Sequence, residues 1–416
     1  MAFTLLDPSS TSKLNRFDIP ALSSTHYTDM NLNYTCIPNP NNPEKWIYSN
    51  FVEKIEDKKY FGDNNLKDSS NNKIGNVCLN QQKISAGTHQ IFFSYGFTKA
   101  SLPANSYFGI QLYNNGASDV TYTEFNRGYG FNGTGTGQLG PWEAVAGKTV
   151  HNFLTNTSQS TRTIKSNKSI WLPEDLYALK SGSNIVSGLI KFSVTGSVIV
   201  STYMYSDISK IDGSATIYPH PLNTSDIAKQ YSGIANGIKY KASITLDAKD
   251  MPLYEGERDA NNNIKKSLRI QTCKASISNL KIDGTSASTD LRPITLANPS
   301  STIISSTSPN QNLGNWGFPY EFDVTLKNTS ESTKKICGYV RTDSAGTVKN
   351  YELFPVINSG NTTYYTVLQS VTSATVYNSW KFFEKELKKD EMFNSTFTFV
   401  NGTNGTASNS LFFRLY

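Results

Sequence analysis

Residues 320–326 read YEFDVTL, a run in which apolar and polar side chains alternate. A polar turn that begins at Asn328 follows, and a second run, KKICGYVRT, begins at Lys334. Alternation with a period of two is typical of a half-buried antiparallel strand, because successive side chains point to opposite faces of the sheet. The stretch therefore predicts two strands joined by a turn.

The same order of features occurs earlier in the chain. Residues 107–130 read YFGIQLYNNGASDVTYTEFNRGYG, which again gives a strand, an Asn-led polar turn and a second strand. Asparagine suits such a turn because it accepts a positive φ and its side chain can bond to its own backbone. We interpret the two stretches as an internal repeat, which predicts two domains of the same kind.

Short alternating runs separated by Gly, Asn, Asp and Pro continue through most of the chain after residue 80. No long amphipathic helices separate them, so parallel β-α-β units are not expected. The predicted fold class is all-β, with two tandem antiparallel β-sandwich domains at residues 81–225 and 226–416.

Residues 1–80 differ from the rest and are interpreted as an N-terminal extension that wraps the first domain. This extension is expected to contain at most a short helix, from Glu44 to Lys58. Ile47, Phe51 and Ile55 are four residues apart and would share one face of that helix.

Composition restricts the class of protein. The chain has 416 residues, too many for one ordinary core, and its 23 Tyr and 22 Phe favour strands. The net charge of +6 is mild and the basic residues are scattered, so no nucleic-acid partner is expected. No run of about 18 apolar residues is present, so no transmembrane helix is expected. The N-terminus lacks a signal-peptide pattern, so either the chain stays inside the cell or it begins after a removed leader.

The stretch GYGFNG, Gly128 to Gly133, matches the glycine fingerprint of dinucleotide-binding folds. That fingerprint needs a helix directly after it, and the following run of glycines ending in Pro141 cannot begin one at the required place. A Gly-Lys-Thr at Gly147 also fails as a phosphate loop, because Trp142 occupies the position of the required glycine. We interpret the stretch as a flexible loop between strands, anchored at its far end by Trp142, and expect no cofactor.

Residue types that support catalysis or metal binding do not form recognisable patterns. The histidines lie far apart, and a calcium-loop start at Asp259 lacks the required glycine and glutamate. Paired carboxylates could serve glycoside hydrolysis, but acidic residues in loops are usually solvated. The histidines and candidate carboxylates are His26, His89, His151, His220, Glu124, Glu143, Glu255 and Glu257. No catalytic residue and no metal site are predicted, and the protein is expected not to be an enzyme.

Four cysteines are present, and none forms a Cys-x-x-Cys pair. Cys36 and Cys78 lie in the first part of the chain, and Cys273 and Cys337 lie in the last. Disulfides Cys36–Cys78 and Cys273–Cys337 and four buried thiols in a reducing compartment are equally consistent with the sequence.

Exposed aromatic side chains are the one feature that could mark a binding surface. Trp142, Trp171, Trp316 and Trp380 lie near turns or strand ends. Aromatic rings on the face of a sandwich can stack on sugar rings, although Trp more often fills a core. The four residues are the candidate binding residues.

The segment NLGNWGFPYEFDVTLKNTSESTKK, residues 312–335, combines G-N-W-G-x-x-Y, an alternating strand, N-x-S and a basic second strand. This combination resembles surface and secreted all-β proteins of Gram-positive bacteria, and residues 231–250 and 140–144 fit the same resemblance. The resemblance implies a location at the cell surface or outside the cell, although those proteins carry leader peptides that this sequence does not show. It implies no catalytic residues.

Three functions therefore remain open. The preferred one is a non-enzymatic, surface-associated structural or adhesive protein that self-assembles or binds other surface proteins. The second is a carbohydrate-binding protein that uses exposed aromatic residues. The third is an intracellular crystal- or inclusion-forming protein or toxin.

Overall fold

The computed structural model describes part of the chain. The described residues are 2–8, 27–30, 32, 35–38, 45–49, 54–55, 76–97, 106–132, 141–157, 159–179, 184–205, 232–236, 238–251, 267–273, 281–282, 285–286, 317, 319–342, 352–353, 355–366, 368–369, 379–401 and 409–416.

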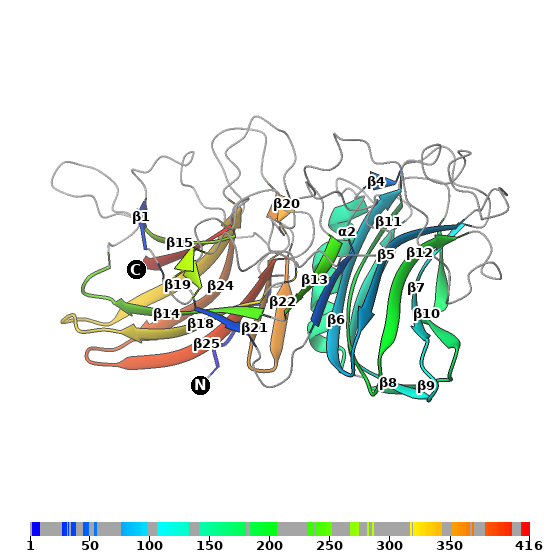
Figure 1. The fold of residues 1–416 in the computed structure, drawn as a ribbon. Helices are drawn as coiled ribbons and strands as arrows, with labels where there is room; N and C mark the ends of the chain where they lie inside the picture. Colours follow the sequence, from blue (N-terminus) through cyan, green and yellow to red (C-terminus); the bar gives the residue numbers. More distant parts are fainter. Residues whose placement is uncertain are drawn as a thin grey trace. The chain divides into compact units, whose positions relative to one another are not determined.

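The chain forms two compact units, each of which is described by itself. Unit 1 contains Met1–Ile37, Ile238–Asp290 and Leu313–Tyr416, and unit 2 contains Pro38–Gly237 and Leu291–Asn312. Each unit consists of two main β-sheets, so the predicted all-β class with sandwich domains is confirmed (Figure 1).

Unit 2 has a seven-stranded and a four-stranded sheet. The larger sheet runs β13 (Ser232–Asn236), β3 (Lys45–Ser49), β6 (Gly87–Phe97), β11 (Asn184–Val194), β8 (Val120–Asn132) and β9 (Ser160–Ile164), with β4 (Lys54–Ile55) also paired to β6. The smaller sheet runs β10 (Lys168–Leu179), β7 (Ser106–Asn114), β12 (Val198–Tyr205) and β5 (Asn76–Ile84). Helix α2 (Pro141–Thr155) packs against β8 and β11.

Unit 1 has a five-stranded and a six-stranded sheet. The first runs β1 (Tyr27–Asp29), β15 (Ser267–Cys273), β26 (Asn409–Leu415), β19 (Lys334–Thr342) and β24 (Ser379–Leu387). The second runs β2 (Thr35–Pro38), β14 (Ile238–Asp247), β18 (Pro319–Lys327), β25 (Met392–Asn401), β21 (Pro355–Ser359) and β22 (Thr362–Tyr365). Two short pairs complete the unit, β16 (Lys281–Ile282) with β17 (Thr285–Ser286) and β20 (Glu352–Leu353) with β23 (Leu368–Gln369).

The alternation that decides the fold is visible in β18. Burial alternates without interruption along this strand, and Phe322, Val324 and Leu326 are almost fully buried. The rings of Phe322 and Phe397 lie 5.1 Å apart, and Phe397 lies at the same distance from Phe382 of the opposite sheet. Burying such rings contributes roughly 25 cal/mol for each Å² of apolar surface removed from water, which makes this core the main stabilising element of unit 1.

The turn predicted at the centre of each repeat is built around a fully buried asparagine. In unit 2 the Asn114 side-chain amide donates to the carbonyl oxygens of Ser118, at 2.8 Å, and Ile164, at 3.0 Å. Its side-chain oxygen accepts from the Gly116 backbone N–H at 2.9 Å. One side chain therefore closes the turn and ties it to β9.

Unit 1 repeats this arrangement at Asn328. The amide donates to the carbonyl oxygens of Ser332 and Leu387, both at 2.8 Å, and the side-chain oxygen accepts from the Ser330 N–H at 3.1 Å. Asn114 and Asn328 are both 0% exposed. We call this arrangement the Asn-anchored corner, and its two occurrences confirm the predicted internal repeat.

A second turn packs on each corner. Asn167 has φ 55° and donates its backbone N–H to the Asn114 carbonyl oxygen at 2.9 Å. Asp390 has φ 61° and donates in the same way to the Asn328 carbonyl oxygen at 2.8 Å. Positive φ is uncommon outside glycine but tolerated by Asn and Asp. The two corners and the turns packed on them make β7 equivalent to β18 and β8 to β19. In the same way β9 is equivalent to β24 and β10 to β25.

The sheets are not purely antiparallel. Most neighbouring strands pair antiparallel, but β3 and β4 run parallel to β6, β1 runs parallel to β15, and β14 runs parallel to β18. The prediction of a short helix from Glu44 to Lys58 is wrong for the two described segments of that range, because Ile47 lies in strand β3 and Ile55 lies in strand β4. Parallel pairing with β6 outweighs a local helical pattern, since β3 finds its partner far away in the sequence.

Residues 1–80 contribute strands to both units, β3 and β4 to the larger sheet of unit 2 and β1 and β2 to the sheets of unit 1, and their wrapping of the first domain stays a prediction. Phe3 is buried in unit 1, where its ring lies 4.3 Å from that of Phe383 and 5.4 Å from that of Phe393. This part of the extension therefore completes the core of the unit that holds the C-terminal strands.

Candidate binding site

The glycine fingerprint lies at the site where α2 meets the sheet of unit 2. Its first residues, Gly128 to Asn132, belong to strand β8 rather than to a loop. A Cβ atom at Gly128 would lie 2.0 Å from the Thr149 carbonyl oxygen and 2.3 Å from the Phe153 nitrogen, both in α2. Gly128 is therefore required because backbone of the helix approaches backbone of the strand.

Helix α2 begins at Pro141, contrary to the expectation of a loop that continues to Trp142. Proline is favoured in the first turn of a helix, where its missing N–H leaves no bond unmade and its fixed φ suits the helix. Val150 and Thr149 are buried, whereas Lys148 and Thr155 are exposed, so one face of the helix covers the sheet.

The end of α2 is held by a side chain of the strand. The Asn126 amide donates to the carbonyl oxygens of Phe153 and Asn156, both at 3.0 Å. The carbonyl groups at the end of a helix lack hydrogen-bond donors inside the helix, and the Asn126 amide donates to two of these carbonyl groups. The last turn of α2 is thus fixed beside β8.

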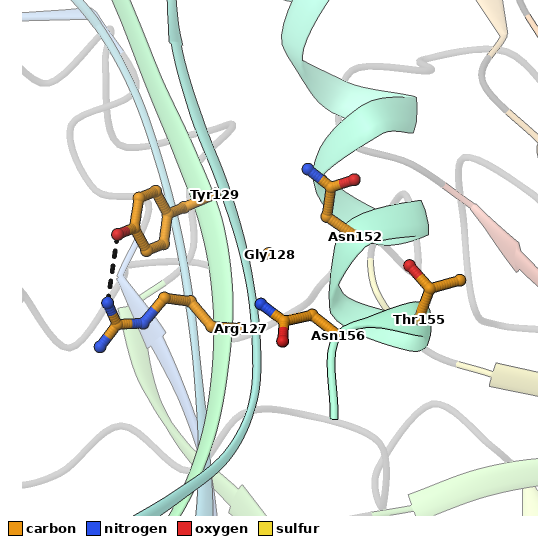
Figure 2. A pocket seen from close by; sticks show the side chains of 6 residues that line it. All are labelled: Arg127, Gly128, Tyr129, Asn152, Thr155 and Asn156. Atoms are coloured by element: carbon orange, nitrogen blue, oxygen red, sulfur yellow. Dashed lines mark hydrogen bonds between the residues drawn. The ribbon is translucent and has the colours of Figure 1, made fainter. Parts of the chain in front are cut away.

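A cavity of about 360 Å³ lies at this junction. It is lined by Arg127, Gly128 and Tyr129 of β8 and by Asn152, Thr155 and Asn156 at the end of α2. Figure 2 shows the Arg127 and Tyr129 side chains on one side of β8 and the helix residues on the other. Apart from the tyrosine ring, the lining consists of groups that donate or accept hydrogen bonds.

The charge of Arg127 is neutralised within the site. Its guanidinium forms an ion pair with the Glu124 carboxylate and donates to the Tyr129 hydroxyl at 3.1 Å. The Tyr122 hydroxyl also donates to that carboxylate, at 2.6 Å. Glu124, one of the carboxylates expected to be solvated, is only 5% exposed. Its burial is tolerated because two donors satisfy it.

This network shifts the pKa of two of its members. Burial, followed by the charge of Glu124 and the hydrogen bond to it, raises the pKa of the Tyr122 hydroxyl. Burial acts to lower the pKa of Arg127, but the hydrogen bond and charge of Glu124 outweigh it, so the net shift is upward. Tyr122 therefore stays neutral and Arg127 stays charged at physiological pH, and neither is suited to proton transfer there.

The tryptophans proposed for binding do not form one surface. Trp142 lies in the first turn of α2, and Trp171 of β10 is half-buried with its ring 5.8 Å from that of Tyr203. Trp380 is 1% exposed and its indole N–H donates to the Leu6 carbonyl oxygen at 3.2 Å, so its expected exposure is wrong. Trp316 lies outside the described residues.

The cysteines can be placed in part. Cys337 is a free, buried thiol. Cys273 lies opposite Asn409 of β26, and Cys337 lies opposite Arg414 of the same strand. Asn409 and Arg414 are five residues apart, so the two cysteines are offset by about 17 Å along β26. A disulfide requires Cα atoms within about 7 Å, so the pair Cys273–Cys337 that the sequence allows is not formed. The pair Cys36–Cys78 stays a prediction.

Other candidates for chemistry are few within the described segments. No group of three His, Cys, Asp or Glu side chains among these residues is placed to hold a metal ion. His89 is buried, and its Nε2 lies 2.8 Å from the Ser85 carbonyl oxygen. Of the helices described, none has the length and apolar character needed to cross a bilayer.

Sequence reasoning missed the residues that line the cavity. One signal was present, because glycine at every second position of a strand indicates close approach of another element on that face. Gly128 and Gly130 follow this pattern, and Pro141 marks the start of a helix that could make the approach. Asn152 and Asn156 carry no comparable signal.

Comparisons with known proteins leave the family open. No protein-family model matches the chain, and no curated protein matches it. Similar solved structures include a chain in the complex of the plant peptide RALF23 with FER and LLG2, with 9% identity, coverage of 90% of this chain and 96% of that chain, and a TM-score of 0.16. The CUB1-EGF-CUB2 domain of human MASP-1/3 has 8% identity, coverage of 81% and 99%, and a TM-score of 0.14.

A protein of Eubacterium rectale provisionally described as secreted has 10% identity, coverage of 98% of this chain and 96% of that chain, and a TM-score of 0.11. At these TM-scores none of the three supports an inference about this chain. The resemblance to surface and secreted proteins of Gram-positive bacteria therefore stays a prediction.

Proposed function

We propose that the protein is a non-enzymatic, surface-associated structural or adhesive protein that works by binding a partner. The observation that supports this proposal is the cavity between β8 and α2. Its lining offers hydrogen-bond donors and acceptors on two rigid elements, and rigid elements position binding groups more accurately than loops.

The chemistry of the cavity favours binding over catalysis. A catalytic acid or base needs a pKa near the working pH and access to the reacting atom. Glu124, the carboxylate beside the cavity, is buried and already accepts from Arg127 and Tyr122. Glycoside hydrolysis needs a second carboxylate facing the first, and none of the residues that line the cavity is acidic.

A sugar-binding surface made of the four tryptophans is supported less well. Trp380 is enclosed in the core of unit 1 and cannot stack on a ligand. Trp171 is half-buried against Tyr203. We therefore assign binding to the cavity rather than to a platform of aromatic rings.

The test of this function is the location and adhesion of the protein in its native cells. Cells are separated into envelope, medium and cytoplasm, and intact cells are treated with protease to remove exposed protein. We expect the protein in the envelope or medium, accessible to protease, and we expect the purified protein to bind to cells that lack it. Recovery in cytoplasmic particles would support the inclusion-forming alternative instead.

A further inference from the structure

Strand β8 is covered unequally along its two edges. On one edge β11 pairs with it from Tyr122 to Asn132. On the other edge β9 pairs with it only from Val120 to Glu124. Among the strands that the structure describes, none pairs with the rest of this second edge, which we call the β8 edge and define as Asn126 to Asn132. The cavity lies along the first part of the β8 edge.

The equivalent edge in unit 1 shows what fits there. Strand β24 pairs with β19 from Lys334 to Arg341, over nearly the whole strand. Val120 and Lys334 are equivalent, because each is the first residue of the strand that follows the buried asparagine. Val120 pairs with Ile164 and Lys334 pairs with Leu387, and the asparagine amide of each corner donates to the carbonyl oxygen of that paired residue. Positions past Glu124 therefore correspond to the part of β19 covered by Ser379 to Lys381 of β24. In unit 1 an antiparallel strand occupies an edge that no described strand covers in unit 2.

We propose that the β8 edge binds an extended peptide of a partner protein, which adds to the sheet as an antiparallel strand beside β8 and in line with β9. This inference rests on the proposed function and names the chemical class of the partner. Main-chain N–H and C=O groups of β8 supply the hydrogen bonds of such a complex, as in other cases of strand addition.

The walls of the cavity suit a peptide backbone. Asn152 and Asn156 of α2 carry amides that can donate and accept at once, which matches the paired donor and acceptor of a peptide group. Figure 2 shows the Asn156 side chain directed toward β8. On the other wall Arg127 is already paired with Glu124, so the partner needs no acidic side chain at this point.

The geometry favours a peptide over a glycan for the same reason. A glycan would use the side chains of the lining alone, whereas a strand also uses the backbone of β8. The repeat also places an antiparallel strand at the equivalent edge of unit 1.

The first experiment uses two fluorescent probes with the full-length protein. One is the heptapeptide SWKFFEK, residues Ser379–Lys385, whose first three residues cover the equivalent edge in unit 1. The other is a heptapeptide library restricted to Val, Ile, Thr, Tyr and Phe, which favour strands. We expect saturable binding of at least one probe by fluorescence anisotropy, and failure of both would overturn the proposal.

N-methylation of the bound peptide then tests the mode of binding. In an antiparallel pair, only every second residue of the peptide directs its backbone N–H toward β8. Methyl groups on those amide nitrogens should therefore weaken binding at least tenfold. Methyl groups on the other set of amide nitrogens should leave it unchanged. Equal effects of the two sets would show contact without strand addition and would refute the inference.

Matched variants locate the site. Thr155 is exposed on the cavity rim, and Thr155→Arg should weaken peptide binding at least tenfold by filling the cavity. Thr161 is also exposed in unit 2 but does not line the cavity, and Thr161→Arg should bind like the natural protein. Equal binding by both variants would overturn the inference. If a glycan array shows the same Thr155 dependence while peptides fail, the inference is wrong but the adhesive function, tested by location, stands.

Discussion

Strand β8 of unit 2 and strand β19 of unit 1 leave the same Asn-anchored corner, yet different elements follow them. After β8 the chain forms α2 and returns as the five-residue strand β9. After β19 it forms the short strands β20 to β23 and returns as the nine-residue strand β24. The corner is held by local hydrogen bonds and is therefore repeated, whereas the connection between the strands is free to differ.

One residue of β8 permits its close contact with α2. Gly128 of β8 lies opposite Leu189 of β11, and Arg341 of β19 lies opposite Ser410 of β26. Leu189 lies five residues before Val194, the partner of Tyr122, and Ser410 lies five residues before Leu415, the partner of Ile336. Since Tyr122 and Ile336 are equivalent, Gly128 and Arg341 occupy equivalent positions. A glycine lets α2 lie directly on β8, and no residue with a side chain could replace it without displacing the helix. The comparison teaches that the cavity depends on a close contact between a helix and a strand, which the described part of unit 1 does not contain.

The largest effect is expected from Gly128→Val. The added side chain meets backbone atoms of Thr149 and Phe153, which cannot move without moving α2. We expect a loss of about 4 kcal/mol in the stability of unit 2, since overpacking against backbone is among the most costly substitutions. Hydrogen exchange followed by mass spectrometry should show faster exchange in β8 and α2 but not in β18 and β19.

Thr123→Val on the same strand is the control for Gly128→Val. Thr123 is partly exposed and near the end of β8 that pairs with β9. Its substitution should change exchange little anywhere. If Gly128→Val exchanged like this control, the close approach of α2 would not limit the residue at this position.

The second effect tests whether the two corners are equivalent. Asn114→Ala and Asn328→Ala each remove an amide that donates to two carbonyl oxygens, one of them in a buried bond, and an oxygen that accepts a backbone N–H. We expect each substitution to lower stability by about 3 kcal/mol, as judged by urea unfolding, because unpaired buried polar groups are costly. Asn115→Ala, at the exposed neighbouring position, should lower it little.

Unequal losses would sharpen the comparison. If only one substitution were costly, the two corners would share geometry without sharing energetic importance. A double variant should show the sum of both losses, since the corners belong to different units and share no hydrogen-bond partner.

The fold class could be predicted because its signals are local. Alternation at Tyr320 to Leu326 and the asparagine that leads each turn are visible in the sequence, and both describe short-range structure. The sequence did not reveal that Asn114 and Asn328 also anchor a third strand, because that contact joins residues 50 and 59 positions apart.

The candidate site could not be predicted for the same reason. Arg127 and Asn152 come together only because α2 folds back onto β8, and the glycine-rich run before Pro141 argued against a helix there. Trp380 shows the converse error. Its position near a strand end suggested exposure, but the N-terminal segment covers it and supplies the acceptor, Leu6, for its indole N–H.

The smallest effect concerns a feature found in unit 1, the buried thiol of Cys337 on β19. The equivalent residue of β8 is Thr123. Burial raises the pKa of the Cys337 thiol from 9.0 to about 11. The unfolded chain therefore loses this proton first as pH rises above about 9, so the contribution of the neutral thiol to stability is full below that pH and declines above it.

Replacing this thiol should make unit 1 less sensitive to alkali. Between pH 7 and pH 10 the natural protein should lose about 1 kcal/mol more stability than Cys337→Ala, as measured by urea unfolding at the two pH values. The difference isolates Cys337, because every other titrating group is common to both proteins. Tyr339 contributes in the same direction, since burial and its hydrogen bond to Tyr416 raise its pKa, but it is present in both proteins. Equal losses would mean that water reaches the thiol in the folded state.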